Sequence, residues 1–377
     1  MHLFLDVFKG FYYSDPIKKE RADVKMTSRE RFKRMYEHRE ADRVPITDGP
    51  WAGTVRRWNR EGMPEGVDWR EYFGVDIIRG IAADNTLRLE QKVIEETDEY
   101  VISTTQWGVT LKYLKNVDST PEFLDYTVKS SDDWARLKAR MAPNRNRVDW
   151  ERLKQNYPKW AADGNWLQAG FWFGFDATHS WMSGFETVIF AMVEQPEWME
   201  DIFNTYLDTC IASYDMIWDE GYRFDAISWA DDMGYKNATF FSKELYRKIL
   251  KPIQKRAIDW AHNKGVYAHL HSCGNIMAFV PELVEIGLDA LNPLEVKAGM
   301  DPIRLKKEFG DKLVFHGGIN AVLWDDKEKI IGEIDRVVPV MKENGGYVFS
   351  SDHSIPNTVS LDNFKAIIAE VKRVGAY

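Results

Sequence analysis

Residues 266–275 read Val-Tyr-Ala-His-Leu-His-Ser-Cys-Gly-Asn, and the architecture of the chain can be worked out from them. Apolar and polar residues alternate as far as His271, and Cys273 and Gly274 follow, as in a β-strand that ends in a turn. Because i and i+2 share a strand face, His271 and Cys273 point the same way. An imidazole and a thiolate together suit zinc. Alternatively, the cysteine is a small buried apolar residue and the histidines are hydrogen-bonded core groups.

Similar strand-like runs occur on both sides of this stretch, and helical patterns separate them. Strands are expected at 166–172, 224–229, 266–271, 288–292, 313–316 and 347–351, with a further one at 43–48. The helix after residue 242 begins with a Ser242 cap, and Gly287 and Gly345 end two others. Strands that alternate with helices predict βα units and a parallel sheet. The predicted fold is therefore α/β, a (β/α)8 TIM barrel.

The first half of the chain departs from this rhythm. Residues 1–25 are expected to form an N-terminal arm, and Thr27 or Ser28 to cap a first helix. Residues 26–377 are expected to form a single barrel domain. A β-branched, alternating region around 84–118 predicts a small antiparallel sheet inserted into or flanking the barrel. Residues 121–160 look polar and helical.

Composition excludes several classes of protein. The 377 residues carry a net charge of −9, which argues against binding to nucleic acid or an anionic membrane. No run approaches the roughly 18 apolar residues of a membrane span, and no signal peptide is recognised. Two cysteines give no disulfide framework, which favours a reducing cytoplasm. A homodimer is a further expectation. The 15 Trp residues suggest an aromatic-lined pocket.

Polar residues gather where the predicted strands end, which is the active-site rim of a (β/α)8 barrel. The strand ends deliver Asp231 and Asp232, His271 and Cys273, Glu295, His316 and Asn320, and finally Asp352 and His353. Further residues are expected in the pocket wall, namely Trp51, Trp172, His179 and Trp229. A purely structural barrel has no reason to collect such groups at one end.

Several of these residues also admit structural roles. Asp231 and Asp232 fit a helix-capping loop with solvated carboxylates. His316 precedes two glycines and fits a position packed beside a tight turn. Glu295 fits a surface ion pair with Lys297, and His353 lies among turn-forming residues.

Five segments, in this order, resemble the uroporphyrinogen decarboxylase superfamily. They are Asp231-Asp-Met-Gly234, His271-Ser-Cys-Gly-Asn275, Asn292-Pro-Leu-Glu295, His316-Gly-Gly-Ile-Asn320 and Ser350-Ser-Asp-His-Ser-Ile-Pro356. The resemblance covers roughly Met26 to the C-terminus and implies a (β/α)8 barrel. One branch, the uroporphyrinogen decarboxylases, uses no cofactor and binds a tetrapyrrole with an arginine-rich segment and a pyrrole-binding Asp. Here the corresponding residues 44–51 contain no arginine.

The other branch comprises cobalamin-dependent methyltransferases that use zinc. Their pattern is a His-x-Cys pair, a later Glu and a Cys near the last strand. His271, Cys273 and Glu295 match, and His353 stands where that last cysteine is expected. The resemblance implies zinc held by His271, Cys273 and His353, with Glu295 or water in the fourth position, since histidine also ligates zinc.

The activity implied is transfer of a methyl group between a corrinoid, carried by a separate corrinoid protein, and a small methoxylated or thiol substrate. Asp231, Asp232 and Asn320 would hold polar groups of that methyl donor or acceptor. Two alternatives stay open. One is a metal-free decarboxylase-type lyase in which Asp231 or Asp232 handles protonation. The other is a non-catalytic relative that binds a tetrapyrrole or corrinoid.

Overall fold

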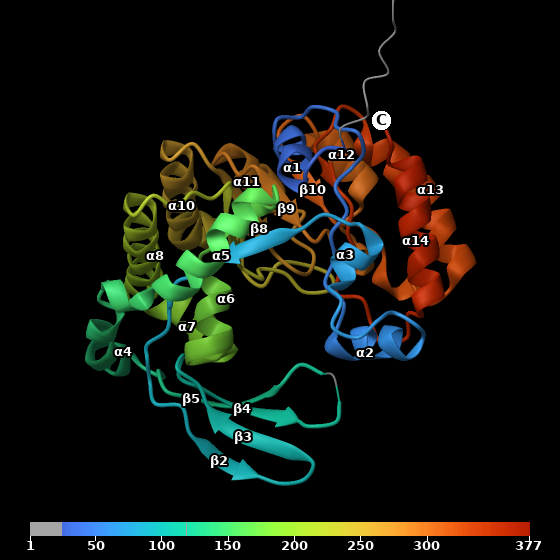
Figure 1. Cartoon of the computed structure of the whole chain (residues 1–377). Coiled ribbons are helices and arrows are strands. Elements are labelled where there is room, and N and C mark those ends of the chain that lie inside the picture. The colour runs from blue at the N-terminus through green and yellow to red at the C-terminus, as the bar shows by residue number, and fades with distance from the viewer. Residues whose placement is uncertain (1–24, 118) are drawn as a thin grey trace, which may run out of the picture.

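The computed structural model describes residues 25–117 and 119–377, so the arm predicted over 1–25 lies outside the described residues except for its last one. The central element is a curled parallel sheet (Figure 1). Its seven strands, in spatial order, are β1 (Ile78–Ile81), β6 (Trp166–Gly170), β7 (Ala226–Ala230), β8 (Tyr267–His271), β9 (Ala290–Asn292), β10 (Val314–His316) and β11 (Tyr347–Val348). Strand order follows chain order, as in a (β/α)8 barrel, and the predicted fold class is confirmed.

The strand predicted at 43–48 is an irregular extended segment that lies between the two ends of this sheet. Phe349 N donates to Pro45 O at 2.9 Å, and Thr47 N donates to Phe349 O at 3.0 Å. On the other side, Asp76 N, just before β1, donates to Ile46 O at 2.8 Å. The segment therefore occupies the eighth position of the barrel, although too few ladder bonds form for a regular strand.

A buried ion network fixes the junction between the eighth-position segment and the start of β1. Asp76 accepts from Arg31 Nη1 at 2.9 Å, from Arg43 Nη1 at 2.6 Å and from the backbone N of Ile46 at 2.8 Å. The side chain of Asp76 is fully buried and those of both arginines nearly so. One carboxylate thus joins the first helix, the eighth-position segment and the start of β1.

Helices surround the sheet, with α8 and α10 on one side and α13 and α14 on the other (Figure 1). The helix α1 (Ser28–Tyr36) begins at the predicted cap, because Thr27 and Glu30 form a reciprocal capping box. The other helices are α2 (Ala52–Arg60), α3 (Trp69–Phe73), α4 (Ser131–Leu137), α5 (Trp150–Ala162), α6 (Phe175–Thr178), α7 (Phe185–Glu194), α8 (Pro196–Asp219), α9 (Lys243–Leu245), α10 (Lys251–Asn263), α11 (Val280–Glu285), α12 (Pro302–Phe309), α13 (Lys327–Lys342) and α14 (Leu361–Val374). The Ser242 cap is also present, at the start of α9. Across the described residues, none of these helices combines the length and apolarity that crossing a membrane requires.

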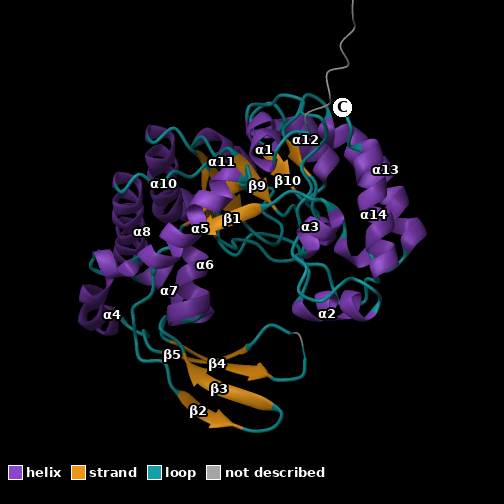
Figure 2. Cartoon of the chain, in the orientation of Figure 1, coloured by secondary structure: helices purple, strands orange, loops and turns teal. Residues whose placement is uncertain are grey.

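The second sheet is antiparallel and lies to one side of the barrel (Figure 2). It contains β2 (Val93–Glu96), β3 (Tyr100–Thr104), β4 (Val109–Leu114) and β5 (Glu122–Tyr126). It rests on the barrel through aromatic contacts, such as Phe123 against Trp181, whose ring centroids are 6.0 Å apart.

Two details of the prediction for this half were wrong. Residues 78–81, where no barrel strand was predicted, pair in parallel with β6 and belong to the barrel. Residues 122–126, expected within a helical region, pair with β4 as an edge strand. Both segments are short and carry charge or glycine, so the neighbouring strand rather than local pattern determines their conformation.

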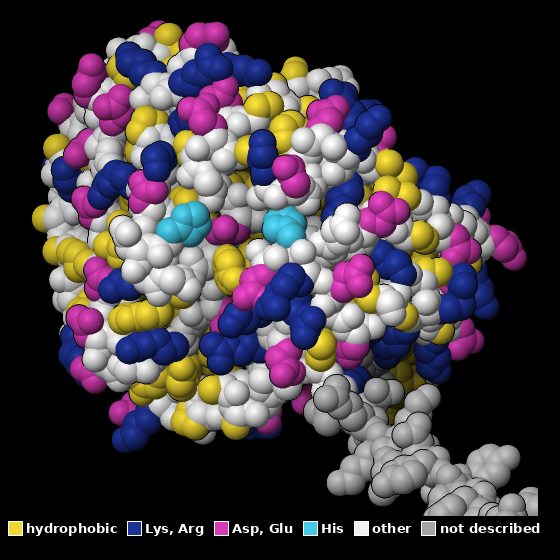
Figure 3. Space-filling view, turned by 90° about the horizontal axis from the view of Figure 1, so that it is seen from above, with side chains coloured by type: hydrophobic (Ala, Val, Ile, Leu, Met, Phe, Trp, Pro, Cys, Tyr) yellow, Lys and Arg dark blue, Asp and Glu magenta, His cyan; other side chains and the backbone are white. Residues whose placement is uncertain are grey.

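Charge on the outer surface is mixed. Figure 3 shows acidic and basic side chains interspersed over one face, with no broad area of a single sign. This face therefore offers no basic footprint for nucleic acid, in keeping with the net charge of −9.

Candidate active site

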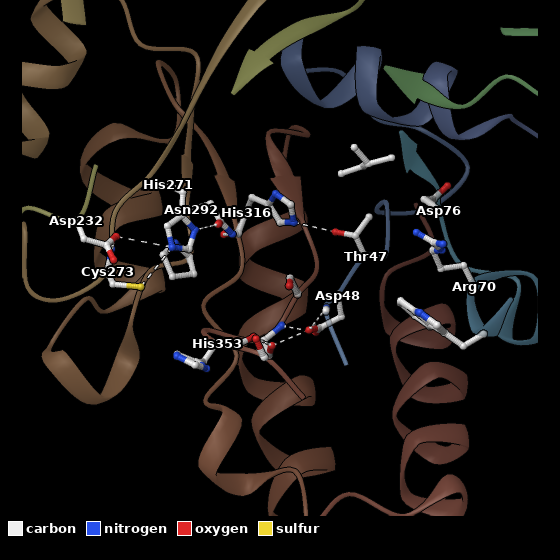
Figure 4. Close-up of a pocket in the computed structure, with 17 residues that line it drawn as sticks. Thr47, Asp48, Arg70, Asp76, Asp232, His271, Cys273, Asn292, His316 and His353 are labelled. Carbon is white, nitrogen blue, oxygen red and sulfur yellow. Dashed lines mark hydrogen bonds and ion pairs between the residues drawn. The ribbon is translucent and has the colours of Figure 1, made fainter. Parts of the chain in front are cut away.

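A cavity of about 530 Å³ opens at the carboxyl ends of the barrel strands (Figure 4). Its volume suits a small organic molecule. The residues that line it are Thr47, Asp48, Gly49, Trp69, Arg70, Asp76, Ile78, Asp232, His271, Cys273, Asn292, Pro293, His316, Ser350, Ser351, His353 and Ser354.

One end of the cavity holds a group of three possible metal ligands, which we call the triad: Asp232, His271 and Cys273. One ligand atom from each lies within 4.8 Å of the other two. Cys273 Sγ is 3.3 Å from His271 Nε2, and that nitrogen is 3.8 Å from Asp232 Oδ1. Donor atoms around a tetrahedral zinc, each at about 2.0–2.3 Å, are separated by about 3.3–3.8 Å. The nitrogen-to-sulfur and nitrogen-to-oxygen separations fall in this range, and a nitrogen, a sulfur and an oxygen are donors that zinc accepts.

Strand register brings the triad together. Ala230 at the end of β7 pairs with His271 at the end of β8, and Asp231 N donates to His271 O at 2.8 Å. Just beyond this pair, Asp232 and Cys273 both line the cavity, and Cys273 N donates to Asp232 Oδ1 at 2.7 Å. His271 and Cys273 point the same way, as the alternation of the strand predicts.

The imidazole of His271 is held from its far side by Asn292, at the end of β9. His271 Nδ1 lies 2.6 Å from Asn292 Oδ1, and Asn292 Nδ2 donates to His316 O at 3.0 Å. In Figure 4 the ring lies between the amide and the triad's other two members. The ring orientation is therefore fixed by the neighbouring strand.

Burial, reinforced by the carboxylates of Asp232 and Glu295, raises the pKa of the Cys273 thiol. The free thiol is therefore kept protonated, and a divalent cation at the triad would reverse this effect by binding the thiolate. Burial lowers the pKa of His316 to about 3, with a smaller contribution from His271, so its imidazole is neutral at physiological pH.

Glu295 and His353, the other two predicted ligands, lie outside the triad. Glu295 Oε2 accepts from Gly274 N at 2.7 Å, and Lys297 Nζ is 3.5 Å from Oε1. His353 lines the same cavity, and its side chain is exposed. Their roles as ligands stay predictions.

Three predicted substrate-binding residues hold loops and do not line the described cavity. Asp231 is fully buried and accepts from Gln254 Nε2 at 2.8 Å and Asp176 N at 3.0 Å, and burial raises its pKa to about 8. Asp352 accepts from the backbone N of Ala321 at 2.7 Å and of Val296 at 2.9 Å. Asn320 caps the turn that follows it by accepting from Val322 N.

The predicted wall residues Trp51, Trp172, His179 and Trp229 also lie outside the lining of this cavity. Trp51 precedes α2 as its N-cap. Trp172 packs against Trp107 at 5.7 Å between ring centroids, and Trp229 is buried against Phe173 at 5.5 Å. Burial lowers the pKa of His179 to about 4.

Sequence reasoning missed the opposite end of the cavity. Thr47 Oγ1 is 2.8 Å from His316 Nε2. Asp48 accepts from Ser351 N at 2.7 Å and from Ser351 Oγ at 2.8 Å, and burial raises its pKa to about 6. Thr47 and Asp48 end the segment predicted as the first strand, so the strand-end rule already applied to later strands would have found them.

Comparison with known proteins agrees with this architecture. The family model for uroporphyrinogen decarboxylase (URO-D) matches residues 100–374, so the chain belongs to the uroporphyrinogen decarboxylase family. Two curated proteins, the uroporphyrinogen decarboxylases of Helicobacter pylori strains P12 and Shi470, are each 29% identical over 147 residues. Each match covers 37% of this chain and 38% of the relative, so the similarity spans less than half of their length.

Among solved structures, a methyltransferase from Methanosarcina mazei superposes with a TM-score of 0.61 at 16% identity. The alignment covers 92% of this chain and 98% of that protein. At this identity the likeness establishes the fold, a barrel of the same kind over nearly the whole chain.

Proposed function

We propose that the protein is a zinc-dependent methyltransferase that moves a methyl group between a corrinoid carried by a separate protein and a small methoxylated or thiol substrate. The observation that carries this proposal is the triad of possible metal ligands at one end of a substrate-sized cavity. Family membership and the fold shared with a methyltransferase support it.

Asp232, His271 and Cys273 would hold the zinc, with Glu295, His353 or water completing the coordination. When bound there, zinc supplies a Lewis acid for an ether oxygen or a thiol sulfur. Glu295 keeps the Cys273 loop in place through Gly274 N. The triad residues lie at or just after the ends of β7 and β8, whereas Glu295 follows β9 and His353 follows β11.

The cavity residues would bind and orient the organic substrate. Neutral His316, hydrogen-bonded to Thr47, offers a polar contact near the middle of the cavity. Asp48 and the serines at 350 and 351 form a second polar region, and Trp69, Ile78 and Pro293 add apolar walls. A small molecule with an apolar body and a polar end would satisfy both regions.

The corrinoid would arrive on another protein, because the barrel and the inserted sheet account for the described residues. Both cysteines are free, which is consistent with a reducing cytoplasm as the place of the reaction.

A second candidate function, a metal-free decarboxylase-type lyase, is favoured by the names of the family model and the curated relatives. The two are separated by measuring bound zinc in the purified full-length protein, together with turnover of two substrate classes. We expect about one zinc per chain and a corrinoid absorption change that depends on zinc and a thiol or methoxylated compound. A metal-free protein that releases a porphyrinogen product from uroporphyrinogen would instead establish the lyase.

A further inference from the structure

We propose that Asn292 is a positioning residue that sets the tautomer of His271 and so aims a lone pair of that imidazole at the metal position. The inference rests on the proposed function, because it concerns how His271 would bind zinc. The tautomer itself is a property of the metal-free protein and is testable there.

The argument begins with the amide of Asn292, because its two ends are chemically distinct. The β8–β9 register places Asn292 directly beside His271. One end of the amide lies 3.0 Å from the carbonyl oxygen of His316, which can only accept a hydrogen bond. The NH2 end must face that carbonyl, so the amide oxygen must face His271.

The tautomer follows from this orientation. Asn292 Oδ1 can only accept, and it lies 2.6 Å from His271 Nδ1, so Nδ1 must carry the proton. In a neutral imidazole the proton on Nδ1 leaves Nε2 with a lone pair. Nε2 is the nitrogen that faces Cys273 Sγ at 3.3 Å and Asp232 Oδ1 at 3.8 Å.

The carbonyl of a backbone peptide therefore determines, through one side-chain amide, which nitrogen of His271 can bind a cation. Without Asn292, Nδ1 loses the acceptor that holds its proton. The carboxylate of Asp232 would then favour a proton on Nε2, and that nitrogen would have no lone pair to offer zinc. Groups that fix a ligating histidine in this way typically change metal affinity by about 10–100-fold when removed.

Two substitutions separate this role from a merely structural one. Asn292→Leu is nearly isosteric and has no acceptor for His271. Asn292→Asp keeps an acceptor for Nδ1 while losing the donor to His316 O. The proposal therefore expects the Asp variant to retain the tautomer that the Leu variant loses.

The first measurement is a long-range ¹H–¹⁵N correlation spectrum of the metal-free full chain with ¹⁵N-labelled histidine, at a pH where the imidazoles are neutral. His271→Gln identifies the signals. We expect the Nδ1–H tautomer in the wild type and in Asn292→Asp, and a shift toward Nε2–H in Asn292→Leu. An Nε2–H tautomer in the wild type, or no change in the Leu variant, would overturn the inference.

The second measurement is zinc affinity by competition with a chelator, with thermal unfolding as the check on folding. We expect Asn292→Leu to weaken zinc binding by about 10–100-fold and Asn292→Asp to stay close to the wild type. Equal losses in both variants would reduce Asn292 to a structural residue. If the protein binds no zinc at all, the proposed function fails while the spectra still decide the tautomer.

Discussion

Gly274 lies so close to Gly234 that a Cβ built on Gly274 would come within 2.2 Å of the carbonyl carbon of Gly234. It would also lie 2.6 Å from the backbone N of Tyr235. Asn275 N donates to Tyr235 O at 2.8 Å across the same contact. The loops after β7 and β8 therefore meet backbone to backbone, and this contact keeps Asp232 within reach of Cys273.

Substituting Gly274 should separate these loops. Gly274→Ala is expected to weaken zinc binding by about tenfold or more, because the added methyl displaces the loop that carries Cys273. Chelator competition measures the effect. Gly221→Ala is a matched control, since Gly221 also has a positive φ of 91° but nothing lies within 4 Å of an added Cβ. Equal zinc affinity in the two variants would refute the claim that the loop contact positions the triad.

The relative importance of the proposed ligands can be ranked by substitution. We expect Asp232→Asn to weaken zinc binding more than His353→Gln, because Asp232 lies within the triad and His353 does not. Cys273→Ala should remove stoichiometric zinc, whereas Cys210→Ala, a buried residue on α8, should retain it. Elemental analysis after dialysis gives the occupancies. A larger loss of zinc in His353→Gln than in Asp232→Asn would contradict this ranking and would indicate that the metal lies nearer the last strand.

Asp76 should be a large contributor to stability. Asp76→Asn leaves Arg31 and Arg43 buried without their shared anion, and breaking a buried pair in this way costs about 3–5 kcal/mol. Asp42→Asn provides the comparison, because Asp42 also pairs with Arg31 but its side chain is 37% exposed, so about 1 kcal/mol or less is expected. Urea denaturation at neutral pH gives both values. Similar losses in the free energy of unfolding for the two variants would mean that Asp76 contributes no more to stability than Asp42 does.

A pH-dependent contribution is expected from Glu282 on α11. Hydrogen bonds from Arg247 and Lys251 lower its pKa from 4.5 to about 2. Because the folded-state pKa is the lower one, the ionised group stabilises the fold above about pH 4.5, and this stabilisation disappears as the pH falls through about 2. Glu282→Gln should therefore cost about 1 kcal/mol at pH 7.

The difference between Glu282→Gln and the wild type should shrink steadily below pH 4.5, as followed by denaturant unfolding. Glu285→Gln is the control, because Glu285 contacts the same Lys251 but its side chain is 70% exposed. A constant difference between pH 7 and pH 3 would show that packing, rather than charge, is responsible.

The second half of the barrel was predictable because its strands carry their own signal. Residues 267–271 alternate, and strong helix patterns flank them, so strand ends were located closely enough to bring His271 and Cys273 together. The strand β1 has only four residues, including Arg79 and Gly80, and its pairing partner in β6 lies more than 80 residues away. Such a strand is defined by its partner, so local sequence does not reveal it.

The site was only partly predictable for the same kind of reason. Asp231 and Asp232 are adjacent carboxylates, and strand pairing alone determines that the first is buried in a loop and the second faces the cavity. Asn292 opens one of the five segments that carry the family resemblance, but the segment does not reveal its supporting role. That role depends on His271 on one side and the His316 carbonyl on the other. The short-range sequence pattern identifies candidate site residues, and the contacts between strands determine the role of each one.

The strands β1 and β6 pair directly, although 84 residues, 82–165, separate them in the sequence. These residues therefore form a long insertion between two neighbouring strands of the barrel. Mutation on the exposed side of this insertion can change its surface while the triad, which lies at the ends of β7 and β8, keeps its geometry. The three possible metal ligands thus lie outside this insertion, whose outermost strand, β2, is exposed along its whole length.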